Sequence, residues 1–247
     1  MSTITTVPAL ISAPPIPSPP PAEPIRVHLP IYIEEEVLIP GWVVDQDSFR
    51  RWARSDDFPA SGRFSFIDGM LWVDRTMEEF FSHNQMKAEY FGVLGPLVKT
   101  ARKGYFAPDG CLWSNPEADV STIPDSLFFT YDTLNSGRIR LVQGATRGYM
   151  EVEGTPDMTL EIVSDSSVKK DTKVMKEKCA KAGVREYWLV DARGAEPRFE
   201  IWLLRHETYE PAAQEDGWLT SVVFGKAFKL HHEKDPNGHP FYQLLVH

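Results

Sequence analysis

The sequence lacks the features that mark disulfide-bonded secreted proteins, membrane spans and strongly basic nucleic-acid binders. Only two cysteines, Cys111 and Cys179, occur in 247 residues. They leave no disulfide framework, so a reducing cytoplasm is the expected compartment. No apolar run approaches the ~20 residues of a membrane-spanning helix, so we expect no membrane association. The net charge of −9 argues against binding nucleic acid through overall electrostatic attraction.

The basic residues that are present are unevenly distributed. Residues 169–181 contain six lysines, at positions 169, 170, 173, 176, 178 and 181. An acidic protein can still hold nucleic acid through such a local basic stripe. The same run is equally typical of a solvated helix face, so both interpretations stay open.

Proline is concentrated at the N-terminal end. Residues 1–30 hold nine of the 20 prolines and only two charged residues. We expect residues 1–30 to be a disordered, polyproline-like tail. The chain is 42% hydrophobic, and residues 31–247 are long enough for a single domain, with its core at about 45–205.

The pattern of apolar residues predicts an α/β domain. The predicted elements, in chain order, are helix 47–54, strands 64–67 and 70–73, helix 82–99, several strands within 105–164, helix 170–182, and strands 186–191 and 199–204. The Asp68-Gly69 pair between two apolar runs predicts a tight hairpin. The unit of strand 158–164, helix and strand 186–191 predicts two neighbouring parallel strands joined by a crossover.

Glu161 is the most informative position, because it interrupts a run typical of a strand buried on both faces. An unpaired buried carboxylate is costly or keeps its proton. A second carboxylate, Asp125, comes just before another apolar run, 127–129. Two carboxylates and a lysine on neighbouring elements could hold a divalent cation against a phosphodiester. The alternative is that Glu161 pairs with a buried basic group for structural reasons.

Several short motifs occur in an order that resembles a known family. They are Ile67-Asp68-Gly69, His83, Pro124-Asp125, Gly154-Thr155-Pro156-Asp157, residues 160–164 and residues 182–191. In order and rough spacing they resemble the Uma-two family of endonucleases, within the PD-(D/E)XK superfamily, over about residues 45–205. The resemblance implies a restriction-endonuclease-like α/β core, with a central mixed β-sheet flanked by helices and extra β-strands.

The resemblance also implies a metal site. It implies Mg²⁺ (or Mn²⁺) bound by Asp125 and Glu161, with a lysine near the attacked phosphate. We expect the carbonyl group of Ile162 to be a further ligand. In the metal-free protein, neutralising Asp125 or Glu161 should relieve repulsion between the two carboxylates.

The chain departs from the family at the lysine. The family commonly carries this lysine four residues after an aspartate that aligns with Asp171, where this chain has Met175. Lys170 is the preferred substitute and Lys178 the other. His83, at a predicted helix N-terminus, could contact a phosphate or position a water, or it could be a solvated histidine. Asp157 is expected to cap a loop, and Glu186 and Asp191 to be structural.

Two functions therefore remain from the sequence. The leading one is a metal-dependent endonuclease that hydrolyses phosphodiester bonds in DNA, with a homodimer as one option for its assembly. The alternative is a catalytically inactive module of the same fold that binds nucleic acid or a protein partner, which Met175 and the negative net charge favour. An RNA or small nucleotide substrate also stays open, because no base-reading motif is visible.

Overall fold

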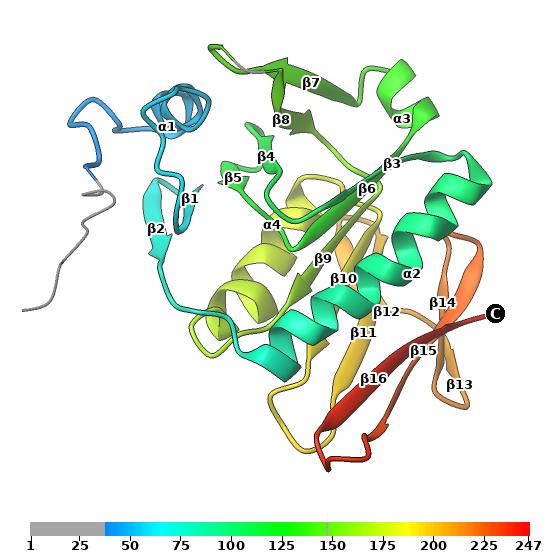
Figure 1. The fold of residues 1–247 in the computed structure, drawn as a ribbon. Helices are drawn as coiled ribbons and strands as arrows, with labels where there is room; N and C mark the ends of the chain where they lie inside the picture. Colours follow the sequence, from blue (N-terminus) through cyan, green and yellow to red (C-terminus); the bar gives the residue numbers. More distant parts are fainter. Residues whose placement is uncertain (1–37, 147) are drawn as a thin grey trace, which may run out of the picture. The chain divides into compact units, whose positions relative to one another are not determined.

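The structure is a computed structural model that describes residues 38–146 and 148–247. The tail predicted over residues 1–30 lies outside the described residues. None of the helices in the described part is long and apolar enough to cross a membrane. The prediction of an α/β domain with mixed sheets flanked by helices is confirmed (Figure 1).

The helical elements are few and the strands many. The helical elements are α1 (Gln46–Ala53), η1 (Phe80–Gln85), α2 (Met86–Ala101), α3 (Tyr131–Asn135), η2 (Lys170–Met175) and α4 (Lys176–Lys181). The strands are β1 (Arg63–Ile67), β2 (Met70–Asp74), β3 (Gly104–Pro108), β4 (Leu112–Asn115), β5 (Val120–Thr122), β6 (Ser126–Thr130), β7 (Ile139–Gln143), β8 (Tyr149–Gly154), β9 (Met158–Ile162), β10 (Glu186–Asp191), β11 (Arg198–Arg205), β12 (Thr208–Pro211), β13 (Gln214–Glu215), β14 (Trp218–Ser221), β15 (Lys226–Lys234) and β16 (Pro240–Val246).

The central sheet has the order β12-β11-β10-β9-β6-β3. It is mixed, because β9 and β10 run parallel, with Glu161 opposite Leu189, while the other neighbours run antiparallel. The predicted crossover is thus confirmed: the chain leaves β9, passes through η2 and α4, and returns as β10. This connection carries Lys170 and Asp171 past the end of β9.

The two faces of the central sheet are covered by different helices, as Figure 1 shows. Leu160 and Ile162 belong to the core cluster that contains the buried face of α2. Met175 and Cys179 belong to the other cluster, with Tyr187 and Leu189. Side chains alternate along a strand, so Glu161 points to the face opposite Leu160 and Ile162, the face that η2 and α4 cover.

A second six-stranded sheet, β2-β1-β5-β4-β8-β7, and a four-stranded sheet, β13-β14-β15-β16, complete the domain. The predicted hairpin forms β1 and β2, with Ile67 paired to Met70. Its turn residues Asp68 and Gly69 have φ of 51° and 71°, the left-handed conformation that such a two-residue turn requires. The four-stranded sheet supplies the extra strands that the resemblance implies.

The starts of two predicted α-helices are different from the prediction. The helix predicted from residue 82 begins as the π-helical turn η1, and the helix predicted from residue 170 begins as η2. In η1 the Asn84 N–H donates to the carbonyl of Glu79, five residues earlier, at 3.0 Å. Single π-helical turns are frequent at functional sites, because they re-aim side chains. Here they carry His83, Lys170 and Asp171.

Candidate active site

The structure brings Asp125 and Glu161 together from adjacent strands. Asp125 immediately precedes β6, and β6 pairs antiparallel with β9, which contains Glu161. The N–H of Ile162 donates to Asp125 Oδ2 at 2.7 Å, and the N–H of Asp125 donates to Glu161 Oε2 at 3.4 Å. Each carboxylate is therefore held against the backbone of the other strand.

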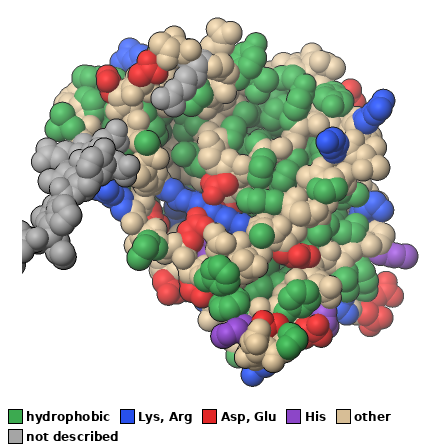
Figure 2. Space-filling model, viewed as in Figure 1, with side chains coloured by type: hydrophobic (Ala, Val, Ile, Leu, Met, Phe, Trp, Pro, Cys, Tyr) green, Lys and Arg blue, Asp and Glu red, His purple; other side chains and the backbone are tan. Residues whose placement is uncertain are grey.

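A small polar pocket lies at this junction. It is lined by Arg63, Thr76, Met77, Glu78, His83, Asp125, Glu161, Ile162, Ser164, Ser167, Lys170 and Asp171, and it has a volume of about 30 Å³. That volume admits about one water molecule or one ion. Figure 2 shows acidic and basic side chains gathered in a recess between β2 and β9.

Asp125 is the ionised carboxylate of the pocket. Its Oδ1 accepts a hydrogen bond from Arg63 at 2.9 Å and forms an ion pair with Lys87 Nζ at 3.0 Å. Burial alone would raise the pKa of Asp125, but the charges of Lys87 and Arg63 lower it to about 2. Asp125 thus stays charged at any physiological pH.

Glu161 has the opposite balance. Its side chain is fully buried, and Oε1 has no hydrogen-bond partner among the described residues. Burial raises the pKa of Glu161 well above its usual range, and the nearby charge of Lys170 compensates only in part. Burial therefore favours the protonated form of Glu161 in the metal-free protein.

Asp171, which follows Lys170 on η2, is in a similar state. Its Oδ1 has no hydrogen-bond partner among the described residues, and the nearest cation is Lys170 Nζ at 3.6 Å. Burial raises the pKa of Asp171 to about 6, with the Lys170 charge opposing this rise. The pKa of Lys170 is itself raised: burial would lower it, but Glu161 and Asp171 outweigh that effect. Lys170 is therefore a protonated donor inside the pocket.

These residues fit a divalent cation. Mg²⁺ is usually held by one or two protein carboxylates, with waters and substrate oxygens completing its shell. Glu161 Oε1 has no hydrogen-bond partner among the described residues, and Asp125 Oδ2 accepts one short hydrogen bond, which leaves a lone pair free. Over residues 38–146 and 148–247, no group of three or more His, Cys, Asp or Glu side chains could hold a metal ion. The candidate site therefore relies on two carboxylates and backbone or solvent oxygens.

His83 lines the pocket and is not a solvated histidine. Only 3% of its surface is exposed. Nδ1 lies 3.2 Å from Glu78 and Nε2 lies 3.8 Å from Asp125. The interpretation of His83 as a solvated helix-end residue is therefore wrong, and the π-helical turn η1 is the reason, because it aims the ring inward.

The two candidate lysines lie in different places. Lys170 lines the pocket. Lys178 lies outside it: its ammonium group binds the Asp68 carboxylate and, at 2.8 Å, the carbonyl oxygen of Ala118. Met175 is fully buried in the core, as its helical stripe predicts. The structure thus makes Lys170 the only one of the two substitutes that could reach a phosphate in this pocket.

Two cations that bind Asp125 were not predicted from the sequence. They are Arg63 and Lys87. Arg63 opens β1, far away in the chain. Lys87 had a signal, because it follows His83 by four residues and such pairs share one face of a helix. Two acidic partners, Glu78 and Asp109, bind the same cations.

The three acidic residues predicted to be structural do have structural partners. Asp157 accepts hydrogen bonds from Thr130 N–H at 2.8 Å and Thr133 Oγ1 at 2.6 Å, which fixes the start of α3. Glu186 accepts two backbone N–H bonds from the segment between β14 and β15. Asp191 pairs with two arginines near the start of β11.

Comparison with known proteins identifies the family. A family model described as "Uma2: Putative restriction endonuclease" matches residues 46–231. The chain belongs to the Uma2 family. The predicted family is thereby confirmed, and the match contains every residue of the candidate site.

A solved structure supports the fold assignment of this Uma2 chain. It is described as the crystal structure of a putative nuclease belonging to DUF820 from Anabaena variabilis ATCC 29413, and it is similar with a TM-score of 0.50. The identity is 20%, over 66% of this chain and 83% of that chain. At this identity the likeness shows a shared fold. No curated protein matches the chain.

Proposed function

We propose that this Uma2 protein is a metal-dependent endonuclease that hydrolyses phosphodiester bonds in DNA, with Mg²⁺ or Mn²⁺. The observation that carries the proposal is the pairing of two buried carboxylates, from β6 and β9, in one pocket with a buried lysine. One of these carboxylates has an oxygen without a partner among the described residues. The nuclease descriptions of the family and of the similar structure support the same reaction class.

Each residue of the pocket then has a distinct task. Asp125 and Glu161 would hold the cation, with the Ile162 carbonyl as a third oxygen. When bound there, a divalent cation would lower the pKa of a coordinated water and neutralise charge on the phosphate. Lys170, protonated in the same pocket, would donate to the phosphate oxygen on which negative charge develops.

The surrounding groups keep this arrangement in place. The Ile162 N–H and the two cations Arg63 and Lys87 fix the position and the charge of Asp125. Asp171 raises the pKa of Lys170 and so keeps it protonated. His83, buried between Glu78 and Asp125, would contact the phosphate or position a water.

One observation favours the second candidate, a catalytically inactive module that binds nucleic acid or a protein. Arg63 and Lys87 already neutralise Asp125, as internal cations do in a purely structural ion pair. We favour the endonuclease, because Glu161 Oε1 and Asp171 Oδ1 still have no hydrogen-bond partner among the described residues, and burial still raises the pKa of both carboxyl groups.

The test separates metal binding from cleavage. Calorimetric titration with Mn²⁺ should show binding to the wild type and its loss in Glu161→Gln. Plasmid nicking with Mg²⁺ or Mn²⁺ should be lost in the same variant. Lys170→Ala should slow nicking by roughly 10²–10³-fold, the usual cost of one donor to developing charge, while cation binding persists. Lys173→Ala, an exposed lysine of the same element, is the matched control.

Two results would contradict the proposal in different ways. Wild-type protein that binds no divalent cation would remove the metal site. Protein that binds the cation and DNA but nicks neither plasmid nor single strands would support the inactive module. We also propose that the protein is a homodimer, which light scattering of the purified protein can test. A cytoplasmic location is proposed as well, and fractionation of cells that express the protein can test it.

A further inference from the structure

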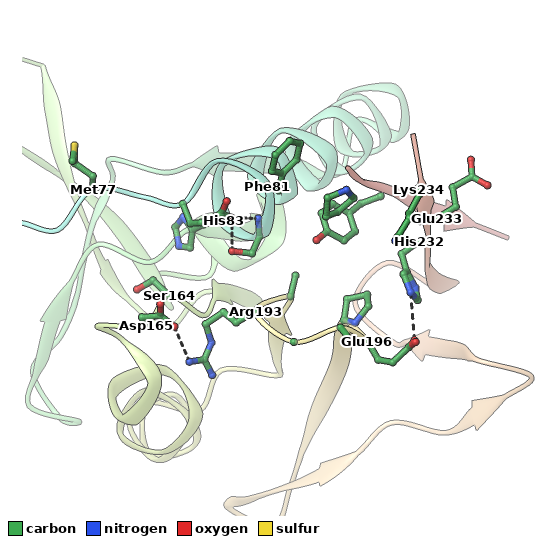
Figure 3. A pocket seen from close by; sticks show the side chains of 18 of the residues that line it. Met77, Phe81, His83, Ser164, Asp165, Arg193, Glu196, His232, Glu233 and Lys234 are labelled. Atoms are coloured by element: carbon green, nitrogen blue, oxygen red, sulfur yellow. Dashed lines mark hydrogen bonds and ion pairs between the residues drawn. The ribbon is translucent and has the colours of Figure 1, made fainter. Parts of the chain in front are cut away.

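A much larger cavity adjoins the small catalytic pocket. It has a volume of about 740 Å³ and lies between η1, the loop from β10 to β11, and the β15–β16 hairpin (Figure 3). The two hollows share Thr76, Met77, His83 and Ser164 in their walls. A group bound in the large cavity would therefore lie directly beside a phosphodiester held at Asp125 and Glu161.

The wall of the cavity carries aromatic surface. Phe81 of η1 lines it, with its ring stacked on His239 at 4.9 Å between centroids and 18° between planes. This stacking fixes the orientation of the Phe81 ring. Tyr242 of β16, which is buried, lines the cavity as well. Flat apolar surfaces of this kind suit a planar heterocycle.

Two close pairs of ionisable side chains lie in the wall of the cavity. Arg193 lies 3.2 Å from Asp165, and His232 lies 3.4 Å from Glu196. Figure 3 shows Phe81 on one side of the cavity and Arg193 and Glu196 on the other. The polar groups of these side chains offer hydrogen-bond donors and acceptors to the polar edge of a heterocycle.

We propose that this cavity receives one unstacked nucleoside next to the scissile phosphodiester, so that the substrate is single-stranded or locally unpaired DNA. The volume lies within the ~300–1,000 Å³ range of small-ligand pockets. The catalytic pocket, at about 30 Å³, has no room for a base or a sugar. A base inside a duplex is stacked and paired. It can enter a cavity only after extrusion from the duplex, which requires unpairing and unstacking, whereas a base in a single strand has no partner to leave.

The inference rests on the proposed function, because it assumes that a phosphodiester binds at Asp125 and Glu161. Its test measures binding separately from cleavage. Glu161→Gln protein is titrated, with fluorescence anisotropy as the readout, into three labelled 12-mers of equal backbone length. They are a thymidine single strand, the same strand in a duplex, and a single strand of abasic residues. The thymidine strand should bind at least about tenfold more tightly than the other two.

Phe81 supplies the specific variant. In the Glu161→Gln background, Phe81→Ala should weaken binding of the thymidine strand roughly tenfold, and Phe81→Leu should weaken it nearly as much although it keeps the apolar volume. Binding of the abasic strand should not change. Tyr149→Ala is the matched control, since Tyr149 is an aromatic residue that is 64% exposed on β8 and does not line the cavity.

The possible results separate the two proposals. Equal affinity for all three 12-mers, no binding of any of them, or no effect of either Phe81 variant would overturn the nucleoside cavity. Nicking of a duplex plasmid by the wild type, combined with one of these results, would leave the endonuclease proposal intact. A preference for the thymidine strand that depends on Phe81, without cleavage of any DNA by wild-type protein, would keep the cavity and reject catalysis.

Discussion

Asp171→Asn should stabilise the metal-free protein, by an amount that grows from about pH 4 and levels off above about pH 6. Burial raises the pKa of Asp171 from 3.8 to about 6, so the folded state holds the proton more tightly than the unfolded state does. The contribution of protonated Asp171 to the free energy of unfolding is therefore fully present below pH ~4, and it is lost as the pH rises to about 6. Each pKa unit corresponds to about 1.4 kcal/mol, so the ionised carboxylate costs the folded state about 3 kcal/mol at neutral pH.

Thermal unfolding in EDTA measures this effect. For a domain of this size, 1 kcal/mol shifts the melting temperature by about 2–4 °C. Asp171→Asn should then melt roughly 6–12 °C above the wild type at pH 8, and the difference should shrink to near zero at pH 4. Asp165→Asn is the matched control, because it removes the same charge from a side chain that is 95% exposed. It should shift stability by no more than about 0.5 kcal/mol at either pH.

The reasoning would be refuted by a gain that is the same at pH 4 and pH 8, or by a lower melting temperature of Asp171→Asn at pH 8. The first result would mean that the gain does not come from the ionisation of Asp171. The second would mean that nearby cations stabilise the ionised carboxylate in the folded protein. A divalent cation gives a further check. If a cation binds at Glu161, the wild type should gain more stability from Mn²⁺ at pH 8 than at pH 4, since protons compete for the same oxygens.

The sequence predicts the central topology because local signals and the fold agree there. Asp68-Gly69 is a turn that only a left-handed backbone can form, and the structure shows that turn. The apolar run around Glu161 and the helix before residue 186 leave few alternatives to a parallel crossover. Glu161 is detectable for a different reason, because a carboxylate within a run of apolar residues is unusual for a buried strand.

The remaining parts of the site depend on contacts between distant elements. Arg63 and Lys87 bind Asp125 from β1 and α2. No spacing in the sequence predicts the ion pair between Arg63 and Asp125, which are 62 residues apart. The π-helical turns η1 and η2 have no recognised sequence signal of their own, yet they determine that His83 points inward and that Lys170 lines the pocket.

The electrostatic expectation from the sequence was wrong for Asp125. It treated Asp125 and Glu161 as two repelling carboxylates, so that neutralising either one would stabilise the metal-free protein. In the structure Asp125 has two cations of its own and a lowered pKa, whereas Glu161 has a raised pKa. A pair of titratable groups whose pKa values are pushed apart in this way is typical of sites in which the two groups have different roles.

Three further predictions test the structure around the site. Gly154→Ala should prevent the β7–β8 pairing and lower the melting temperature by several degrees, because its Cβ would lie 2.2 Å from the Arg138 carbonyl oxygen at a φ of +113°. Glu186→Ala should destabilise the domain by about 1–3 kcal/mol in urea unfolding, since it removes the side-chain acceptor of the buried Val223 N–H and of the partly buried Val222 N–H. Asp125→Asn should destabilise the metal-free protein by about 2–3 kcal/mol at pH 7, because Lys87 and the partly exposed Arg63 lose one of the three carboxylates that they share. Since the pKa of Asp125 is lowered to about 2, the contribution of Asp125 is present above pH ~4 and is lost as the pH falls toward 2, so the urea midpoints of this variant and the wild type should converge in acid. A variant at least as stable as the wild type at pH 7 would show instead that Asp125 is repelled by its neighbours and not held by the two cations.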